Sequence, residues 1–147
     1  MDIITFGKKE DGKEYIIRPA IYCVLLDSQS NTVAIIQTGD GKYFLPGGGI
    51  EDIETHVECL KREALEEMGM DIEIGNFIGR SNQYFYSTNE FKHYLSEGYF
   101  YLGNVGKKIS DPLEEDHSVI WIEPSKAIKN LFHEHQSWAV SEALKQV

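Results

Sequence analysis

Cysteine is scarce in this chain, and long apolar runs are missing from it. Cys23 and Cys59 are the only cysteines, too few for a disulfide framework, which favours a reducing compartment. The stretch Met1–Glu10 has no basic segment followed by an apolar one, and no apolar run approaches the length that crosses a bilayer. We therefore expect a cytoplasmic protein that is neither exported through such a leader nor inserted in a membrane.

Basic residues are also few, with 14 Lys and Arg against 24 Asp and Glu and a formal net charge of −10. Binding to a phosphate backbone requires clustered Lys and Arg, so a nucleic-acid duplex is not the expected partner. A small nucleotide held through metal ions is compatible with this charge. The 147 residues predict one domain over 1–147, without internal repeats, and leave a homodimer open.

Strand-forming segments fill the first third of the chain. Ile3–Phe6 and Glu14–Arg18 flank an Asp11-Gly12 turn and are predicted to form a hairpin. Ala20–Leu26 is almost continuously apolar, as a strand buried on both faces would be, and Thr32–Gln37 is its predicted partner. These two strands are expected to lie at the centre of the sheet.

The second half of the chain predicts more strands and a closing helical region. Ile72–Ser87 and Phe91–Leu102 are rich in β-formers and predict a long hairpin, followed by a polar loop over Gly103–Asp116. The aromatic residues of this hairpin are interpreted as cross-strand packing, with stacking on a nucleobase as the alternative. Val119–Ile122 is a predicted strand, and Pro124–Gln146 is predicted to be helical. This order indicates a mixed sheet with helices on its faces.

Carboxylates are concentrated in one stretch, Gly48–Met70. Its opening glycines allow the backbone to approach a ligand closely. Thr55 and Glu58 have the spacing of a capping box, which predicts a helix over about His56–Met68. Gly69 suits the left-handed position that ends such a helix.

The two faces of this predicted helix differ in character. An apolar stripe is formed by Val57, Leu60, Ala64, Leu65 and Met68, and a carboxylate arc, expected to be exposed, by Glu63, Glu66 and Glu67. Carboxylates at these spacings repel one another by roughly a few tenths of a kcal/mol per pair. A divalent cation would reverse this effect, and Mg²⁺ binds a few carboxylates together with substrate phosphates.

These residues also match a known motif. Gly48, five residues, Glu54, seven residues and then Arg62-Glu63-Ala64-Leu65-Glu66-Glu67-Met68-Gly69-Met70 follow the Nudix box, Gly-x5-Glu-x7-Arg-Glu-U-x-Glu-Glu-x-Gly-U with U aliphatic. The chain thus resembles the Nudix hydrolases, which cleave nucleoside diphosphates linked to another moiety. Ala64 is smaller than the usual aliphatic residue, and Ile53 stands where many members have Gly.

The resemblance implies a fold and a set of roles. The fold is an α/β/α sandwich around a mixed sheet, and the activity is a Mg²⁺-dependent pyrophosphohydrolase, with Mn²⁺ as a substitute. Metal ligands would be Glu63, Glu66, Glu67 and the Gly47 carbonyl, while Arg62 would orient the carboxylates. Gly48, Glu54 and Gly69 would shape the loop and the helix ends. Water is the expected nucleophile, and Glu63 is a candidate base as well as a ligand.

Further candidate site residues lie outside the box. Glu115 is predicted to complete the site as a further metal ligand or as the base, because an in-line attack needs a group across from the helix. Glu114 and Asp116 are close rivals, Glu97 is a distant one, and a solvated loop is the alternative reading of this run. Arg18 and Tyr43 are candidate substrate contacts.

Other sequence patterns give weaker indications of a functional site. His133-Glu134-His135 lacks the i, i+4 spacing of a helical metal pair and is interpreted as a helix junction. His56 is expected to be solvated or paired with a carboxylate on the acidic arc. Two other functions remain open: a non-catalytic nucleotide sensor on the same fold, and an acidic Ca²⁺-binding or protein-interaction domain without EF-hand spacing. The sequence does not identify the substrate.

Overall fold

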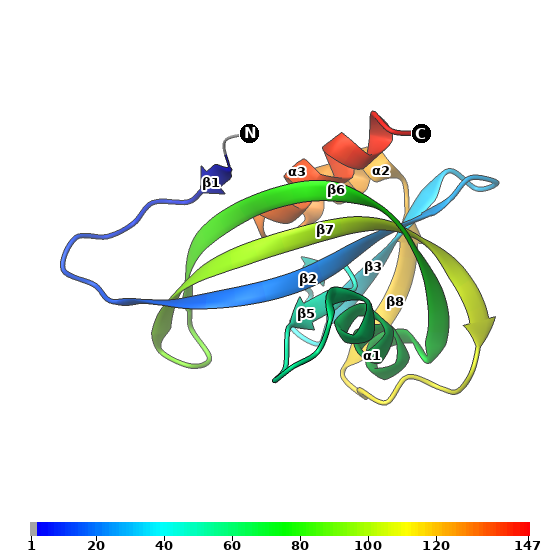
Figure 1. The fold of residues 1–147 in the computed structure, drawn as a ribbon, viewed down its shortest axis with the longest axis horizontal. Helices are drawn as coiled ribbons and strands as arrows, with labels where there is room; N and C mark the ends of the chain where they lie inside the picture. The colour runs from blue at the N-terminus through cyan, green and yellow to red at the C-terminus, as the bar shows by residue number, and fades with distance from the viewer. Residues whose placement is uncertain (1–2) are drawn as a thin grey trace.

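The computed structural model describes residues 3–147 and contains a mixed β-sheet with helices on both faces (Figure 1). The strands are β1 (Ile4–Phe6), β2 (Tyr15–Asp27), β3 (Thr32–Thr38), β4 (Tyr43–Phe44), β5 (Gly47–Gly49), β6 (Met70–Ser87), β7 (Lys92–Lys108) and β8 (His117–Ile122). The helices are α1 (His56–Met68), α2 (Pro124–Asn130) and α3 (Glu134–Leu144). The main strand order is β1-β6-β7-β2-β3-β4, with β5 paired to β2 and β8 to β3.

The alternation of side chains along β2 and β3 explains the layers. Ile21, Cys23 and Leu25 lie in a buried cluster with α1 residues such as Leu60, while Val24 lies in a second cluster that contains α3 residues. Successive residues of a strand face opposite sides of the sheet, so an apolar strand supplies both cores. In Figure 1, α1 lies on the face opposite α2 and α3. The expected α/β/α sandwich is confirmed.

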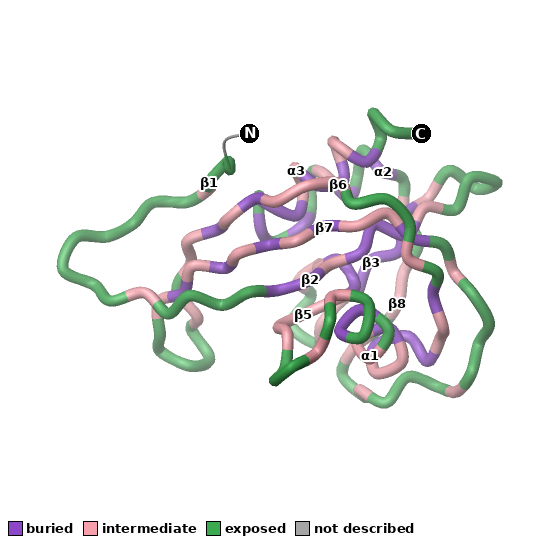
Figure 2. Tube along the Cα trace, in the orientation of Figure 1, coloured by how far each residue is buried: buried purple, intermediate pink, exposed green. Residues whose placement is uncertain are grey.

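The N-terminal hairpin was predicted wrongly. β1 does not pair with β2 but runs parallel to β6, with Ile4 opposite Ser81 and Phe6 opposite Gln83. One edge of β2 is already occupied by β7 from Tyr15 onward. The exposed segment 7–14 joins β1 to the start of β2 through a wide loop, drawn as a green tube in Figure 2.

The long hairpin of β6 and β7 is confirmed, but it extends further than predicted. β7 continues through Lys108, which lies opposite Met70, so the predicted loop over 103–116 begins only after this strand. Register irregularities between Met70 and Gly79 accommodate the polar and glycine-rich sequence of this part within the ladder. The closing helical region consists of two helices, and His133 lies at their junction as the N-cap of α3.

Both cysteines are buried and free. Within residues 3–147, no helix combines the length and apolar character that a membrane crossing requires.

Candidate active site

Helix α1 begins with the predicted capping box. The Glu58 N–H donates to the Thr55 hydroxyl at 3.2 Å, and the Thr55 N–H donates to the Glu58 carboxylate at 2.9 Å. These two bonds satisfy donors that the first turn would otherwise leave unpaired. His56 follows directly, and its Nδ1 lies 2.7 Å from the Tyr101 hydroxyl while its ring packs on Tyr99. The expectation of a solvated or carboxylate-paired His56 is therefore wrong, because its side chain packs against β7.

The end of α1 fixes the loop that follows β7. Gly69 has φ 67°, and its carbonyl accepts hydrogen bonds from the N–H groups of Ile109 and Ser110. The Glu66 carbonyl accepts from Leu113 at 2.9 Å and from Glu114 at 3.2 Å. Carbonyls at the last turn of a helix have no partner within the helix, so they are available to hold this loop. The loop thereby brings Glu114 to the carboxylate-bearing helix.

The glycine loop forms β5, which pairs antiparallel with β2. A Cβ on Gly48 would lie 2.8 Å from Oε1 of Glu63, so the absence of a side chain allows this carboxylate to rest on the loop. The Gly47 N–H donates to Oε1 of Glu67 at 2.9 Å. The loop and the helix are therefore joined through two of the predicted metal ligands.

Arg62 lies at the centre of an ion-pair network. Its Nε and one terminal nitrogen donate to both oxygens of Glu54, at 2.6 and 3.1 Å. Its other terminal nitrogen donates to Glu63 at 2.9 Å and to Glu66 at 3.3 Å. A further bond reaches the Gly49 carbonyl at 3.2 Å. This forked geometry requires a guanidinium rather than an ammonium group.

The carboxylates at this site differ in their pKa values because they differ in burial and in their partners. The hydrogen bond from Arg62 holds the pKa of Glu54 below its ordinary value. Burial raises the pKa of Glu63 to about 6, although Arg62 opposes the shift. Glu67 is only 6% exposed, and burial raises its pKa well above the ordinary value, with Glu63 and Glu114 adding to the effect.

The burial of Glu67 corrects the predicted arc of exposed carboxylates. Glu67 lies seven residues after Leu60, almost two full turns, and therefore on the same side of α1 as the buried stripe. Val57 was placed in that stripe but is 43% exposed, and Cys59 is buried instead. The helix is packed along a face that includes one carboxylate.

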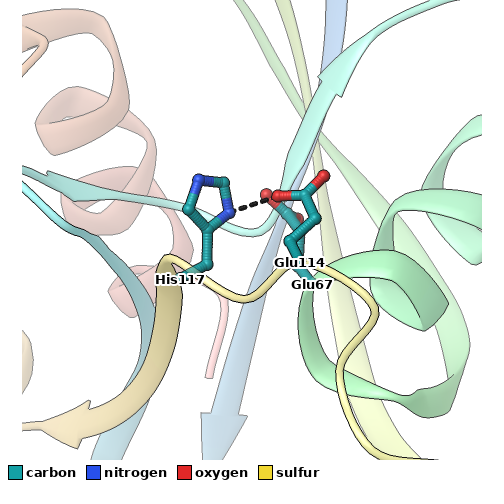
Figure 3. Close-up of side chains that lie close together, drawn as sticks. All are labelled: Glu67, Glu114 and His117. Carbon is teal, nitrogen blue, oxygen red and sulfur yellow. Dashed lines mark ion pairs between the residues drawn. The ribbon is translucent and has the colours of Figure 1, made fainter.

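A cluster of possible metal ligands lies where α1, the loop 109–116 and β8 meet. Glu67, Glu114 and His117 each offer a ligand atom, and these atoms lie within 4.8 Å of one another (Figure 3). Nδ1 of His117 contacts the Glu114 carboxylate. Sequence reasoning did not select His117. Its position, directly after an acidic run and just before the predicted strand Val119–Ile122, was the signal available.

The predicted ligands do not all enter this cluster. Glu114, the named rival of Glu115, is the acidic loop residue that contacts His117, whereas Glu115 is exposed. Glu63 and Glu66 lie beside it, where both pair with Arg62. Gly47 presents its N–H to Glu67.

A pocket of about 250 Å³ opens next to the glycine loop. Arg18 lines it, and a Cβ on Gly49 would lie 2.9 Å from Nε of this arginine, which ties the pocket to the loop. Tyr22 forms part of its wall, and burial raises the pKa of this phenol to about 12. The remaining wall is mostly aromatic or polar and consists of Lys42, Phe44, Phe85, Tyr86, Ser87, Thr88, Asn89, Ser96, Phe132 and His133.

Tyr43 and Phe44 face different surroundings. Tyr43 packs on the buried cluster under α2 and α3, and its carbonyl accepts from the N–H of Phe132. Phe44 lines the pocket. Phe44, Lys42 and Asn89 also line a neighbouring hollow that includes Asp116 and His117. The aromatic pocket and this hollow therefore share part of their lining, and the hollow borders His117 of the cluster.

Comparison with known proteins gives a family and a fold. The sequence model of the NUDIX domain matches residues 16–144. A NUDIX hydrolase from Nitrosomonas europaea superposes with a TM-score of 0.71 at 13% identity, covering 89% of this chain and 90% of that one. The MutT protein of Methanosarcina mazei Go1 gives 0.67 at 19% identity, with 90% and 96% covered. An ADP-ribose pyrophosphatase from Streptococcus suis gives 0.65 at 14% identity, with 88% and 90% covered.

One relative is similar at the level of sequence. The low-salt glycan biosynthesis protein Agl8 of Haloferax volcanii is 36% identical over 64 residues, which are 40% of this chain and 40% of that protein. The aligned segment thus spans less than half of either protein.

Proposed function

This chain belongs to the NUDIX domain family, and we propose that it hydrolyses the pyrophosphate bond of a nucleoside diphosphate linked to another moiety. The observation that carries this proposal is the joining of the glycine loop to buried carboxylates of α1, through the contacts of Gly47 with Glu67 and of Gly48 with Glu63. The loop backbone and the carboxylates are thereby held next to a pocket with two cationic side chains, Arg18 and Lys42.

The donor set fits a divalent metal ion. Glu67 is a carboxylate that burial disfavours in its charged form, and Glu63 and Glu114 add negative charge to its surroundings. A cation there would offset the desolvation and the repulsion together. We propose Mg²⁺, with Mn²⁺ as a substitute, held by Glu67 with Glu63, Glu66 and Glu114 as further ligands and the Gly47 carbonyl nearby. When bound, such an ion neutralises phosphate oxygens and makes water more acidic.

The side chains of the protein then have separate roles in the proposed reaction. Glu63 is the candidate base, because its pKa of about 6 leaves it ionised and able to accept a proton at neutral pH. Arg62 fixes the position of Glu63 and Glu66 and is a positioning residue. Glu115 remains a candidate base from the loop, in competition with Glu114. Water attacks phosphorus, so no covalent intermediate with the chain is required.

The pocket supplies the means to hold the substrate. Arg18 and Lys42 are suited to a diphosphate, and the aromatic rings of Phe44, Phe85 and Phe132 are suited to a planar base or a sugar face. Nucleoside diphosphate sugars are the first substrates to test, because one relative is a glycan biosynthesis protein and one similar structure is an ADP-ribose pyrophosphatase. We further propose a cytoplasmic location, since both cysteines are free thiols.

A non-catalytic nucleotide sensor on the same fold is the competing function. A panel of ADP-ribose, nucleotide sugars, dinucleoside polyphosphates and nucleoside triphosphates, incubated with Mg²⁺ or with EDTA, separates the two. Products are separated by ion-exchange chromatography, and Glu67→Gln serves as the inactive control. Metal-dependent formation of a nucleoside monophosphate supports the enzyme. Binding without turnover across the panel supports the sensor.

A further inference from the structure

The cluster of Glu67, Glu114 and His117 contains a donor that the proposed carboxylate site does not use. A ligand atom of each residue lies within 4.8 Å of the other two. Donor atoms about 2 Å from a shared ion lie at most about 4 Å apart, so small side-chain movements would let all three bind one ion. The third donor is an imidazole nitrogen, which is chemically different from the oxygen ligands around it.

The hydrogen bonds of the protein leave this cluster incompletely satisfied. Glu67 is 94% buried, since its exposed fraction is 6%, and its Oε1 accepts from Gly47. Nδ1 of His117 is buried and contacts the Glu114 carboxylate, but without the alignment of a hydrogen bond. A buried carboxylate side chain and a buried ring nitrogen without an aligned hydrogen bond therefore lie close together (Figure 3).

Three separate elements hold these side chains in place. Glu67 is fixed by α1 and by its bond to the glycine loop. Glu114 is fixed because its N–H donates to the Glu66 carbonyl at the end of α1. His117 begins β8 and lies opposite Thr38 of β3 in an antiparallel ladder. Convergence of three elements on one point favours a built site over a chance encounter of surface side chains.

We propose that His117 is a nitrogen ligand of the metal site, together with Glu67 and Glu114. This inference refines the proposed function and depends on it for its catalytic meaning, but metal binding is measurable without substrate. Imidazole suits Mn²⁺, Co²⁺ and Zn²⁺ better than Mg²⁺, which prefers oxygen ligands. His117 thus extends the metal range of the site from Mg²⁺ toward transition ions.

The direct test uses Mn²⁺ as a spectroscopic probe. Pulsed EPR of the protein with one equivalent of Mn²⁺ should show the coupling of a directly bound imidazole nitrogen. His117→Ala should remove this coupling, whereas His93→Gln, on the distant part of β7, should retain it. Absence of nitrogen coupling in the wild type, or its persistence in His117→Ala, overturns the proposal. Should His117→Ala fail to fold, as judged by circular dichroism, His117→Gln takes its place with the same expectations.

Metal affinities give a second readout. In isothermal titration without nucleotide, His117→Ala should weaken Co²⁺ binding at least about tenfold while changing Mg²⁺ binding less than about threefold. Equal losses for both ions, or no loss for either, contradict a nitrogen ligand.

The two hypotheses fail in different ways. Nitrogen coupling without hydrolysis of any panel member would leave the metal site standing and remove the proposed function. Metal-dependent hydrolysis without nitrogen coupling would support the proposed function and exclude His117 as a metal ligand.

Discussion

Helix α1 contributes carboxylates to two groups in opposite electrostatic situations. In the first group, Arg62 at the middle of the helix supplies a permanent positive charge to Glu54, Glu63 and Glu66. In the second group, Glu67 lies together with Glu114, and the only basic group of their cluster is the imidazole of His117. The first group thus has a permanent counterion within the chain, whereas the second does not. The same helix therefore contributes both to an ion-pair network and to the proposed metal site.

The largest effect should follow from Glu67→Gln, which changes the carboxylate group that lacks a permanent cation. The amide keeps an oxygen for the Gly47 N–H but removes the charge that attracts a metal ion. We expect turnover to fall at least about a hundredfold, since metal stabilisation of the transition state is lost. Stability without metal should be unchanged or higher, because a buried charge has been removed.

The matched control for this change is Glu73→Gln, an exposed glutamate of β6. It should alter neither turnover nor the melting temperature. Near-wild-type turnover of Glu67→Gln at saturating Mg²⁺ would show that this carboxylate is not a ligand.

Arg62→Ala tests the carboxylate group that has a permanent cation. Removal of the guanidinium leaves Glu54 and Glu63 partly buried without their partner, which should lower the free energy of unfolding by about 3 kcal/mol. Urea denaturation measures this loss. Arg62→Lys should recover only part of it, because an ammonium group cannot make the forked contact with Glu54. Full recovery by lysine would mean that charge alone, without geometry, holds the network.

The pH dependence of stability offers a third comparison. The pKa of Glu63 is raised from 4.5 to about 6 by burial, so its proton is held more tightly in the folded state. Its contribution is fully present below pH 4.5 and is lost as pH rises through about 6. The full shift corresponds to about 2 kcal/mol without metal, and solvent screening of this partly exposed group keeps the contribution below that value. Glu63→Gln cannot titrate, so the difference between its unfolding free energy and that of the wild type should change across this window.

Addition of Mg²⁺ should reverse this trend. The cation favours ionised carboxylates, so the rise in melting temperature that it causes should grow from pH 5 to pH 7. A Mg²⁺ effect that is the same at both pH values would indicate binding away from these carboxylates.

The stretch Gly48–Met70 was predictable from sequence because its determinants are local. Thr55, Glu58 and Gly69 fix the helix ends through contacts within a few residues, and the structure has the helix at the predicted bounds. The burial of Glu67 was also accessible from helical periodicity, since it lies two turns after Leu60, but the distribution of charge suggested exposure instead.

The remaining part of the site depends on contacts between distant segments. Hydrogen bonds between the 109–116 loop and the end of α1 place Glu114, rather than Glu115, in the cluster. His117 reaches the cluster because β8 pairs with β3. The parallel pairing of β1 with β6 is likewise a contact between segments that lie far apart in the sequence. None of these arrangements leaves a periodic or short-range signal in the sequence.

The smallest expected effect comes from Thr55→Ala, which alters the start of α1 and leaves the carboxylates of its last turn untouched. Loss of the hydroxyl acceptor frees the Glu58 N–H and breaks half of the capping box, which should lower the free energy of unfolding by about 1 kcal/mol. Thr55→Ser keeps the acceptor and should behave like the wild type. Because Glu54 precedes the cap and binds Arg62, a frayed first turn should weaken that network while metal affinity at Glu67 stays unchanged. An unchanged urea midpoint for Thr55→Ala would mean that the helix start is held by Arg62 and Glu54 rather than by its cap.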